Sequence, residues 1–160
     1  MKILILGHAR HGKDTVAKLL QQEMKLRFIP TSMYIAKHII YPHFQSKYKN
    51  VDECYEDRVN NRELWFNLIN EYSKYDPSRL VKEILKCSDI YVGLRCKKQF
   101  NSVKHLFDVI IWVSRHKHAP KESISSCTVH KTDANILLNN NKTLRDLKYE
   151  VQNICKQIYK

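Results

Sequence analysis

Glycine is scarce in this sequence: the 160 residues include three, and two of them, Gly7 and Gly12, stand five positions apart. No apolar run reaches the length of about 18 residues that a membrane-spanning helix needs. The short apolar run at the start is followed at once by polar residues, which is unlike a secretory signal peptide. We therefore expect a cytoplasmic protein without a membrane partner.

Paired cysteines are also missing. The five cysteines are far apart, no C-x-x-C pair occurs, and no histidine stands at zinc-ligand spacing from them. The His116-x-His118 pair lies among lysines and a proline, as in a solvated loop. The sequence therefore predicts reduced thiols that fill core space, and it does not predict a zinc site.

Acidic residues are too few to balance the basic ones. The chain has 28 Lys and Arg against 16 Asp and Glu, a net charge of +12 and a pI near 9.5, which favours anionic partners. Nucleic acid and phosphorylated small molecules both meet that condition. The basic residues are dispersed among acids without an aromatic stripe, so nucleic acid is the less favoured partner.

Hydrophobic residues make up 43% of the chain and alternate between strand-like and helical patterns, which predicts one domain spanning 1–160. Apolar runs predict strands at 2–6, 89–94, 108–114 and 134–138, with a short extended piece that starts near Phe28. Helical spacing predicts helices at 14–25, 52–72 and 97–106, one ending near Pro42, one starting at Asp76-Pro77, and one capped by Thr143 and Asp146. Continuous apolar strands that alternate with helices indicate an α/β fold with three layers and a parallel sheet.

The stretch GHARHGKDT lies between the first predicted strand and the first predicted helix and fits G-x-x-x-x-G-K. In that setting the amides of residues 9–14 would surround the β-phosphate of a nucleotide, and Lys13 would bridge its β- and γ-phosphates. The expected nucleotide-binding residues are Ala9, Arg10, His11, Gly12, Lys13, Asp14 and Thr15. The alternative is a glycine-containing turn with an exposed lysine.

The hydroxyl of this loop comes one place late, at Thr15, because Asp14 follows the lysine. This form, with R-x-G-K-D-T at 10–15, resembles the loop of bacteriophage deoxynucleoside monophosphate kinases. The segments VDECYEDRVNNRELWFNLINEY, DIYVGLR and DANILLNNNKTLRDL are also similar to those small kinases. The resemblance implies a P-loop NTPase fold, a monophosphate-binding helical segment at 31–72 and a lid-like loop at 115–132. It further implies transfer of the γ-phosphoryl of ATP, with Mg²⁺, to a nucleoside monophosphate in the host cytoplasm.

The same resemblance assigns the acceptor site to residues of 31–72. Ser32 would hydrogen-bond the acceptor nucleotide, and Arg58, with Arg62 as a second candidate, would hold its phosphate through paired guanidinium donors. Trp65 or Tyr34 would stack on the base. Core packing on an amphipathic helix explains Trp65 equally well.

Further roles follow from the resemblance at the ends of later strands. Arg95 would contact the acceptor phosphate, and Arg115 with Lys117 would stabilise the charge of the transferring phosphoryl group. Asp14 and Thr15 would hold Mg²⁺ through water. Tyr91 stands where such kinases often carry an aspartate, which leaves Asp14 and Asp89 as substitutes. Asn139 and Asn140 match the place of donor-base contacts.

Two other functions remain open from the sequence. A kinase of another phosphorylated acceptor, of the dephospho-coenzyme A or phosphomevalonate type, can carry a similar loop. A basic nucleotide-binding protein that interacts with nucleic acid is the second alternative. The base, the sugar and the oligomeric state are also open, and a homodimer is one option.

Overall fold

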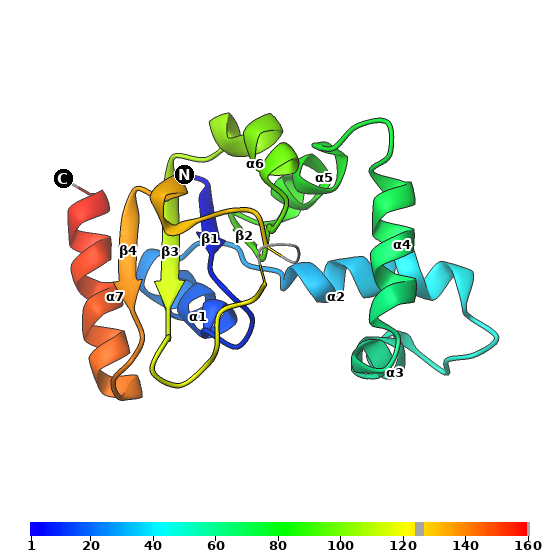
Figure 1. Ribbon diagram of the computed structural model, residues 1–160, viewed down its shortest axis with the longest axis horizontal. Coiled ribbons are helices and arrows are strands. Elements are labelled where there is room, and N and C mark those ends of the chain that lie inside the picture. Colours follow the sequence, from blue (N-terminus) through cyan, green and yellow to red (C-terminus); the bar gives the residue numbers. More distant parts are fainter. Residues whose placement is uncertain (124–126, 160) are drawn as a thin grey trace.

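A parallel sheet forms the centre of the computed structural model, which describes residues 1–123 and 127–159 (Figure 1). Within those residues the strands are β1 (Ile3–Leu6), β2 (Ile90–Val92), β3 (Val109–Ser114) and β4 (Ile136–Asn139). They lie in the order β2-β1-β3-β4, and every neighbouring pair is parallel. The predicted parallel sheet is confirmed. The extended piece near Phe28 adds a single parallel bridge to Ile90 at the edge.

The central strand β1 explains why these runs are continuously apolar. All four of its side chains are fully buried, and they alternate between two core clusters on opposite faces of the sheet. Leu4 and Leu6 belong to one cluster, whereas Ile3 and Ile5 belong to the other. A strand covered on both faces gains from apolar residues at every position, so it shows no polar alternation.

Helices cover both faces of the sheet, which gives the predicted α/β layers. The α-helices in the described part of the chain are α1 (Lys13–Met24), α2 (Thr31–Ile35), α3 (Val51–Glu56), α4 (Arg62–Tyr72), α5 (Arg79–Cys87), α6 (Lys97–Val103) and α7 (Leu144–Ile158). Helices α1 and α7 pack together on one face, and α5 and α6 lie on the other. The predicted capping box of Thr143 and Asp146 begins α7.

Residues 31–72, called the helical lobe below, extend away from the sheet (Figure 1). Helix α2 continues as a π-helix at Ala36–Ile40 and a short 3₁₀ turn at Tyr41–His43, and α3 and α4 complete the lobe. Trp65 of α4 and Cys54 of α3 are buried in the core of the lobe. The lobe therefore has an apolar core of its own that is continuous with one face of the sheet.

The single helix predicted at 52–72 is wrong, because the chain breaks between α3 and α4. Asp57 accepts hydrogen bonds from the side chains of Asn60 (2.9 Å), Asn61 (2.7 Å) and Tyr48 (2.8 Å). Side chains that bond locally in this way compete with the backbone pattern of a helix. The break lets α4 run in a new direction from α3.

The segment that follows β3 folds back over the loop between β1 and α1. Ala119 and Glu122 both make hydrogen bonds to that loop, and a short 3₁₀ turn at Lys131–Asp133 leads into β4. In the described part of the chain, no helix combines the length and the apolar character needed to cross a bilayer.

Candidate functional site

The loop from Gly7 to Gly12 is held in an unusual backbone shape. Gly7, Arg10 and Gly12 have φ angles of +139°, +62° and +89°, and α1 begins at the next residue, Lys13. A Cβ atom at Gly7 would overlap the carbonyl oxygen of Val113 in β3, so glycine is required where the loop presses on the sheet. The two glycines thus allow residues 7–12, called the curl below, to turn tightly directly before α1.

Asn140, the residue after β4, supports this curl through hydrogen bonds. Its backbone amide donates to the carbonyl oxygen of Ser114 (2.7 Å), and its side-chain amide donates to the carbonyl oxygen of His11 (3.0 Å). A Cβ atom at Gly12 would overlap the same side-chain nitrogen. Asn140 is buried, so it acts as a structural support of the loop. Asn139 beside it is exposed and accepts two hydrogen bonds from Asn141.

The amino terminus of α1 is open for an anion. Gly12 is its N-cap and provides no side-chain cap, and in the described part of the chain no side chain satisfies the amides of the first turn. Asp14 and Thr15 are exposed in that turn. Such amides, together with the helix dipole, favour a negatively charged ligand.

The side chain of Lys13, the first residue of α1, folds back to the backbone of the curl. Its ammonium group donates to the carbonyl oxygen of His8 at 2.7 Å. Burial lowers the pKa of Lys13 below its ordinary value, and the positive charge of Arg95 lowers that pKa further. Lys13 is partly buried and lies near a second cation, so an anion close to both would be favoured.

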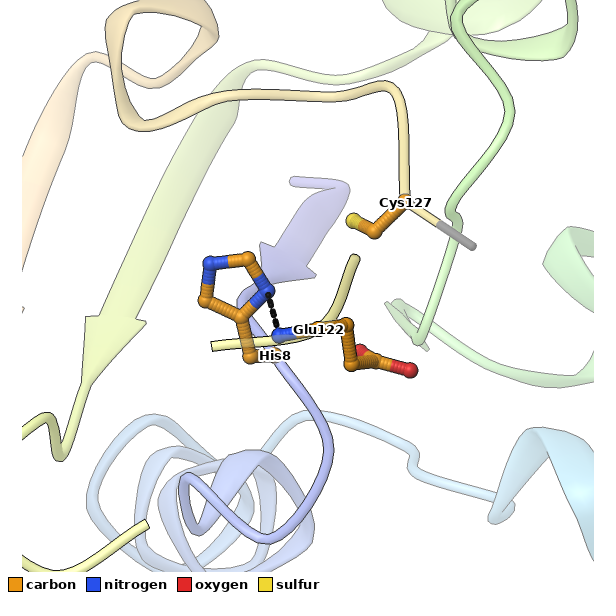
Figure 2. Close-up of side chains that lie close together, drawn as sticks. All are labelled: His8, Glu122 and Cys127. Atoms are coloured by element: carbon orange, nitrogen blue, oxygen red, sulfur yellow. Dashed lines mark hydrogen bonds between the residues drawn. The ribbon is translucent and has the colours of Figure 1, made fainter. Parts of the chain in front are cut away.

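A carboxylate already lies in this position. One oxygen of Glu122 accepts the amide of Ala9 at 2.8 Å, and the other pairs with the guanidinium of Arg95 at 2.9 Å. The backbone amide of Glu122 donates to Nδ1 of His8 at 3.2 Å, as Figure 2 shows. Glu122 was not among the site residues predicted from the sequence. The available signal was that it is the sole acidic residue between Arg115 and Lys131.

His11 joins the loop to the segment after β3. The buried ring accepts the backbone amide of Arg115 at Nδ1 (3.0 Å), so its Nε2 carries the proton and donates to the carbonyl oxygen of Ala119 (3.3 Å). These bonds hold the backbone of Arg115 and Ala119 against the loop. Nε of Arg115 is buried without a partner among the described residues.

A cavity of about 840 Å³ opens beside the loop, large enough for a nucleotide-sized ligand. Its wall includes aromatic rings from the loop and from β3, and the ring centroids of His8 and Trp112 are 5.3 Å apart. The remaining lining residues include His11, Ser114, His116, Lys121, Glu122, Cys127, His130, Lys131, Thr132 and Leu137. Polar and aromatic groups therefore meet at the carboxyl ends of β1 and β3, where ligands of parallel sheets bind.

His8, Glu122 and Cys127 also form the one group of possible transition-metal ligands found among the described residues (Figure 2). Their ligand atoms lie within 4.8 Å of one another. One oxygen of Glu122 already accepts a hydrogen bond and the other is ion-paired with Arg95. Burial raises the pKa of the Cys127 thiol, which disfavours the thiolate that a metal needs. The surrounding cations Lys13 and Arg95 add repulsion. The geometry therefore fits an anion-binding group better than a metal centre.

The residues expected to hold Mg²⁺ differ in their positions. Asp14 and Thr15 are exposed oxygen donors at the edge of the anion site, so they fit a cation held through water. Tyr91 is buried in the core, where burial raises its pKa, and it is not among the residues that line the cavity. Asp89 directly precedes β2, so it lies at the amino end of that strand, whereas the candidate site lies at the carboxyl ends of the strands. It pairs there with Lys2 and Arg27. Asp89 is therefore not a substitute for the missing aspartate.

The residues expected at the acceptor site lie on the helical lobe. Ser32 is in the first turn of α2, whose start is joined to the end of β2 by a hydrogen bond from the Val92 amide to Thr31 (3.3 Å). The guanidinium of Arg58 stacks on the ring of Tyr55, 3.8 Å from its centroid, and donates to the carbonyl oxygen of Tyr55 (2.7 Å).

Two other acceptor candidates sit on α4. Arg62 is exposed, whereas Trp65 is buried with its indole Nε1 unpartnered among the described residues. In the described part of the chain, no hydrogen bond or ion pair joins these lobe residues to Lys13 or Arg95. The structure thus brings together the loop, Arg95 and Arg115, and it leaves the lobe candidates as a separate group.

Comparison with known proteins adds no assignment. No family model matches the chain, and a search of curated proteins found none with significant similarity.

Proposed function

We propose that this protein is a phosphotransferase that moves the γ-phosphoryl group of ATP to a nucleoside monophosphate, with a deoxynucleotide as the acceptor. The observation that carries the proposal is the curl between β1 and α1, where Lys13 lies near the charge of Arg95 and α1 begins without a side-chain cap. The deoxynucleotide preference is supported by the resemblance of R-x-G-K-D-T to phage kinases alone.

The donor side of the proposal is supported by charge and backbone shape together. A triphosphate needs several donors at close range, and the amides of residues 9–14 and the Lys13 ammonium lie on one curl. The cavity beside His8 and Trp112 offers room for the rest of a nucleotide. Lys13, whose pKa is already lowered by burial and by Arg95, is stabilised in its charged form when phosphate binds.

The acceptor side is supported by the placement of the helical lobe. Its first helix starts next to the end of β2, and Arg95 follows the same strand three residues after it ends. An acceptor phosphate held by Arg58 and Arg95 would therefore lie between the lobe and the curl. The lobe also provides Ser32 and the aromatic ring of Tyr34 for recognition of the nucleoside, whereas Trp65 is buried in the core of the lobe and is not available to stack on a base.

The chemistry asked of the protein is positioning and charge stabilisation. An oxygen of the acceptor phosphate forms a bond to the γ-phosphorus while the bond from that phosphorus to the β,γ-bridging oxygen breaks, and ADP leaves. Lys13, Arg95 and Arg115 would hold the oxygens on which negative charge collects. Mg²⁺, when bound, neutralises charge between the β- and γ-phosphates, and Asp14 and Thr15 would hold it through water.

The test is an acceptor panel. The protein is incubated with ATP and Mg²⁺ and each of the common ribo- and deoxynucleoside monophosphates, dephospho-coenzyme A or phosphomevalonate, and ADP is measured. We expect ADP formation that depends on a nucleoside monophosphate. Lys13→Ala should reduce the rate by about a hundredfold or more, whereas Lys18→Ala, an exposed lysine on the same helix, should leave it within about twofold.

Other outcomes would change the assignment. Turnover with dephospho-coenzyme A or phosphomevalonate would keep the donor site and replace the acceptor. ADP formation that needs no acceptor, combined with strongly salt-dependent DNA binding, would favour a nucleic-acid-linked function. A fully active Lys13→Ala protein would refute the role given to the curl.

A further inference from the structure

The Glu122 carboxylate contacts the same donors that two oxygens of a bound phosphate would contact. Its two carboxylate oxygens are taken by different donors, the Ala9 amide at 2.8 Å and the Arg95 guanidinium at 2.9 Å. Both donors belong to the groups proposed above to bind phosphate oxygens. A carboxylate and a phosphoryl group each present negatively charged oxygens at similar spacing, so the same groups can donate hydrogen bonds to either one.

Glu122 is a largely buried carboxylate with two cations, Arg95 and Lys13, close to it. Its side chain is 15% exposed, although the segment that carries it is otherwise basic or neutral. The charges of Glu122 and Lys13 are close enough that Glu122 raises the pKa of Lys13, which opposes the lowering caused by burial and Arg95. Glu122 thus supplies the negative charge that this cluster of cations lacks by itself.

The chain on both sides of Glu122 is tied to the same site. Before it, His11 of the curl bonds the backbone of Arg115 and Ala119. After it, the amide of Thr128 donates to the carbonyl oxygen of Arg95 at 2.9 Å. These anchors use backbone groups, so they do not require the Glu122 carboxylate itself. The side chain is therefore held at the anion position by a segment that would stay in place without it.

We propose that Glu122 is an internal competitor for the phosphate-binding position, so that a phosphoryl ligand binds only when this carboxylate leaves the Ala9 amide and Arg95. The inference rests on the proposed function for its meaning, because it describes how that site is regulated. A ligand that binds one of two states has its apparent affinity reduced by the fraction of molecules in the competent state. Removing the carboxylate charge raises that fraction and strengthens binding.

The experiment measures pyrophosphate binding by isothermal titration calorimetry on three proteins, without metal and without an acceptor. They are the wild type, Glu122→Gln and Glu150→Gln. Glu150 is an exposed residue of α7, so the control makes the same change of net charge away from the site. We expect Glu122→Gln to bind pyrophosphate about tenfold more tightly than the wild type, and Glu150→Gln to stay within about twofold.

Each other result overturns the proposal. Equal affinity of wild type and Glu122→Gln would mean that the carboxylate does not occupy the ligand position. Weaker binding by Glu122→Gln, with an unchanged circular dichroism spectrum and melting temperature, would make Glu122 a positioning residue of the loop. Tight binding of Zn²⁺ that is lost in both Glu122→Gln and Cys127→Ala would assign the carboxylate to a metal site.

This test separates the inference from the kinase proposal. Pyrophosphate binding needs no turnover, so a tenfold gain in Glu122→Gln would support the competitor even if no acceptor in the panel were phosphorylated. Conversely, an active kinase whose pyrophosphate affinity ignores Glu122 would keep the proposed function and remove the inference. If neither the wild type nor Glu122→Gln bound pyrophosphate, the proposal that Glu122 competes with the ligand would be overturned, because removal of the carboxylate charge should expose the site.

Discussion

Asn140 supports the loop between β1 and α1, and the loss of that support should lower the stability of the protein by a predictable amount. A methyl group at Gly12 meets two obstacles, the left-handed backbone and the side-chain nitrogen of Asn140. The left-handed conformation costs a non-glycine residue about 1–2 kcal/mol. Displacing Asn140 breaks its bond to the carbonyl oxygen of His11 and leaves a buried acceptor unsatisfied, at a cost of about 2 kcal/mol.

Gly12→Ala should therefore lower the free energy of unfolding by about 3–4 kcal/mol, and Asn140→Ala should lower it by about 2 kcal/mol. The two effects overlap, since the bond from Asn140 to His11 can be lost only once. The double variant should lose about 3–4 kcal/mol, which is about 2 kcal/mol less than the sum of the single losses.

The assay is urea unfolding of the four proteins of this cycle, followed by circular dichroism. Thermal melts should agree, with a fall of about 2–4 °C for each kcal/mol in a chain of this size. Strict additivity would refute the reasoning, because it would mean that the Gly12 methyl and the Asn140 side chain do not meet. Asn139→Ala is the matched control, since Asn139 is exposed and its side chain accepts hydrogen bonds only from Asn141 in the described structure.

Three further predictions concern charge. Burial and Arg95 lower the pKa of Lys13, so as the pH rises Lys13 should lose its charge at a lower pH than an ordinary lysine does. ATP affinity should fall with that loss of charge, and Arg95→Gln should move the midpoint of the fall to a higher pH. Hydrogen bonds from Asn60, Tyr48 and Lys47 lower the pKa of Asp57 to about 2. Its stabilisation is therefore present above about pH 4 and lost as the pH falls through about 2, so the difference in melting temperature between wild type and Asp57→Asn should shrink over that interval. In steady-state assays Arg58→Gln should raise the KM for the monophosphate about tenfold and leave the KM for ATP unchanged, whereas Lys37→Gln, an exposed position of the lobe, should change neither.

The sheet could be predicted from the sequence because burial on both faces leaves a direct mark on composition. The runs around Leu4 and Ile111 are apolar at every position, and both strands are buried in the sheet as expected. The start of α7 was predictable for a related reason, since Thr143 and Asp146 satisfy each other's backbone amides locally. Signals of this kind depend on neighbours in the chain.

The parts that could not be predicted depend on contacts between distant residues. The break after α3 is stabilised in part by Tyr48, which lies outside the periodic window, although the pair Asn60-Asn61 was a visible warning. Likewise, the G-x-x-x-x-G-K spacing locates the curl, but nothing local reveals that Glu122 is bonded to it from 113 positions away. Charge complementarity between remote segments leaves no periodic trace.

The strand order also has a consequence for synthesis of the protein. β1 lies between β2 and β3, so a chain that emerges amino end first cannot complete its centre until Ser114 has left the ribosome. The curl that follows β1 waits longer still, because its support at Asn140 comes after β4. A nascent polypeptide that has not yet exposed Asn140 would therefore carry the glycine motif without the side chain that supports the curl.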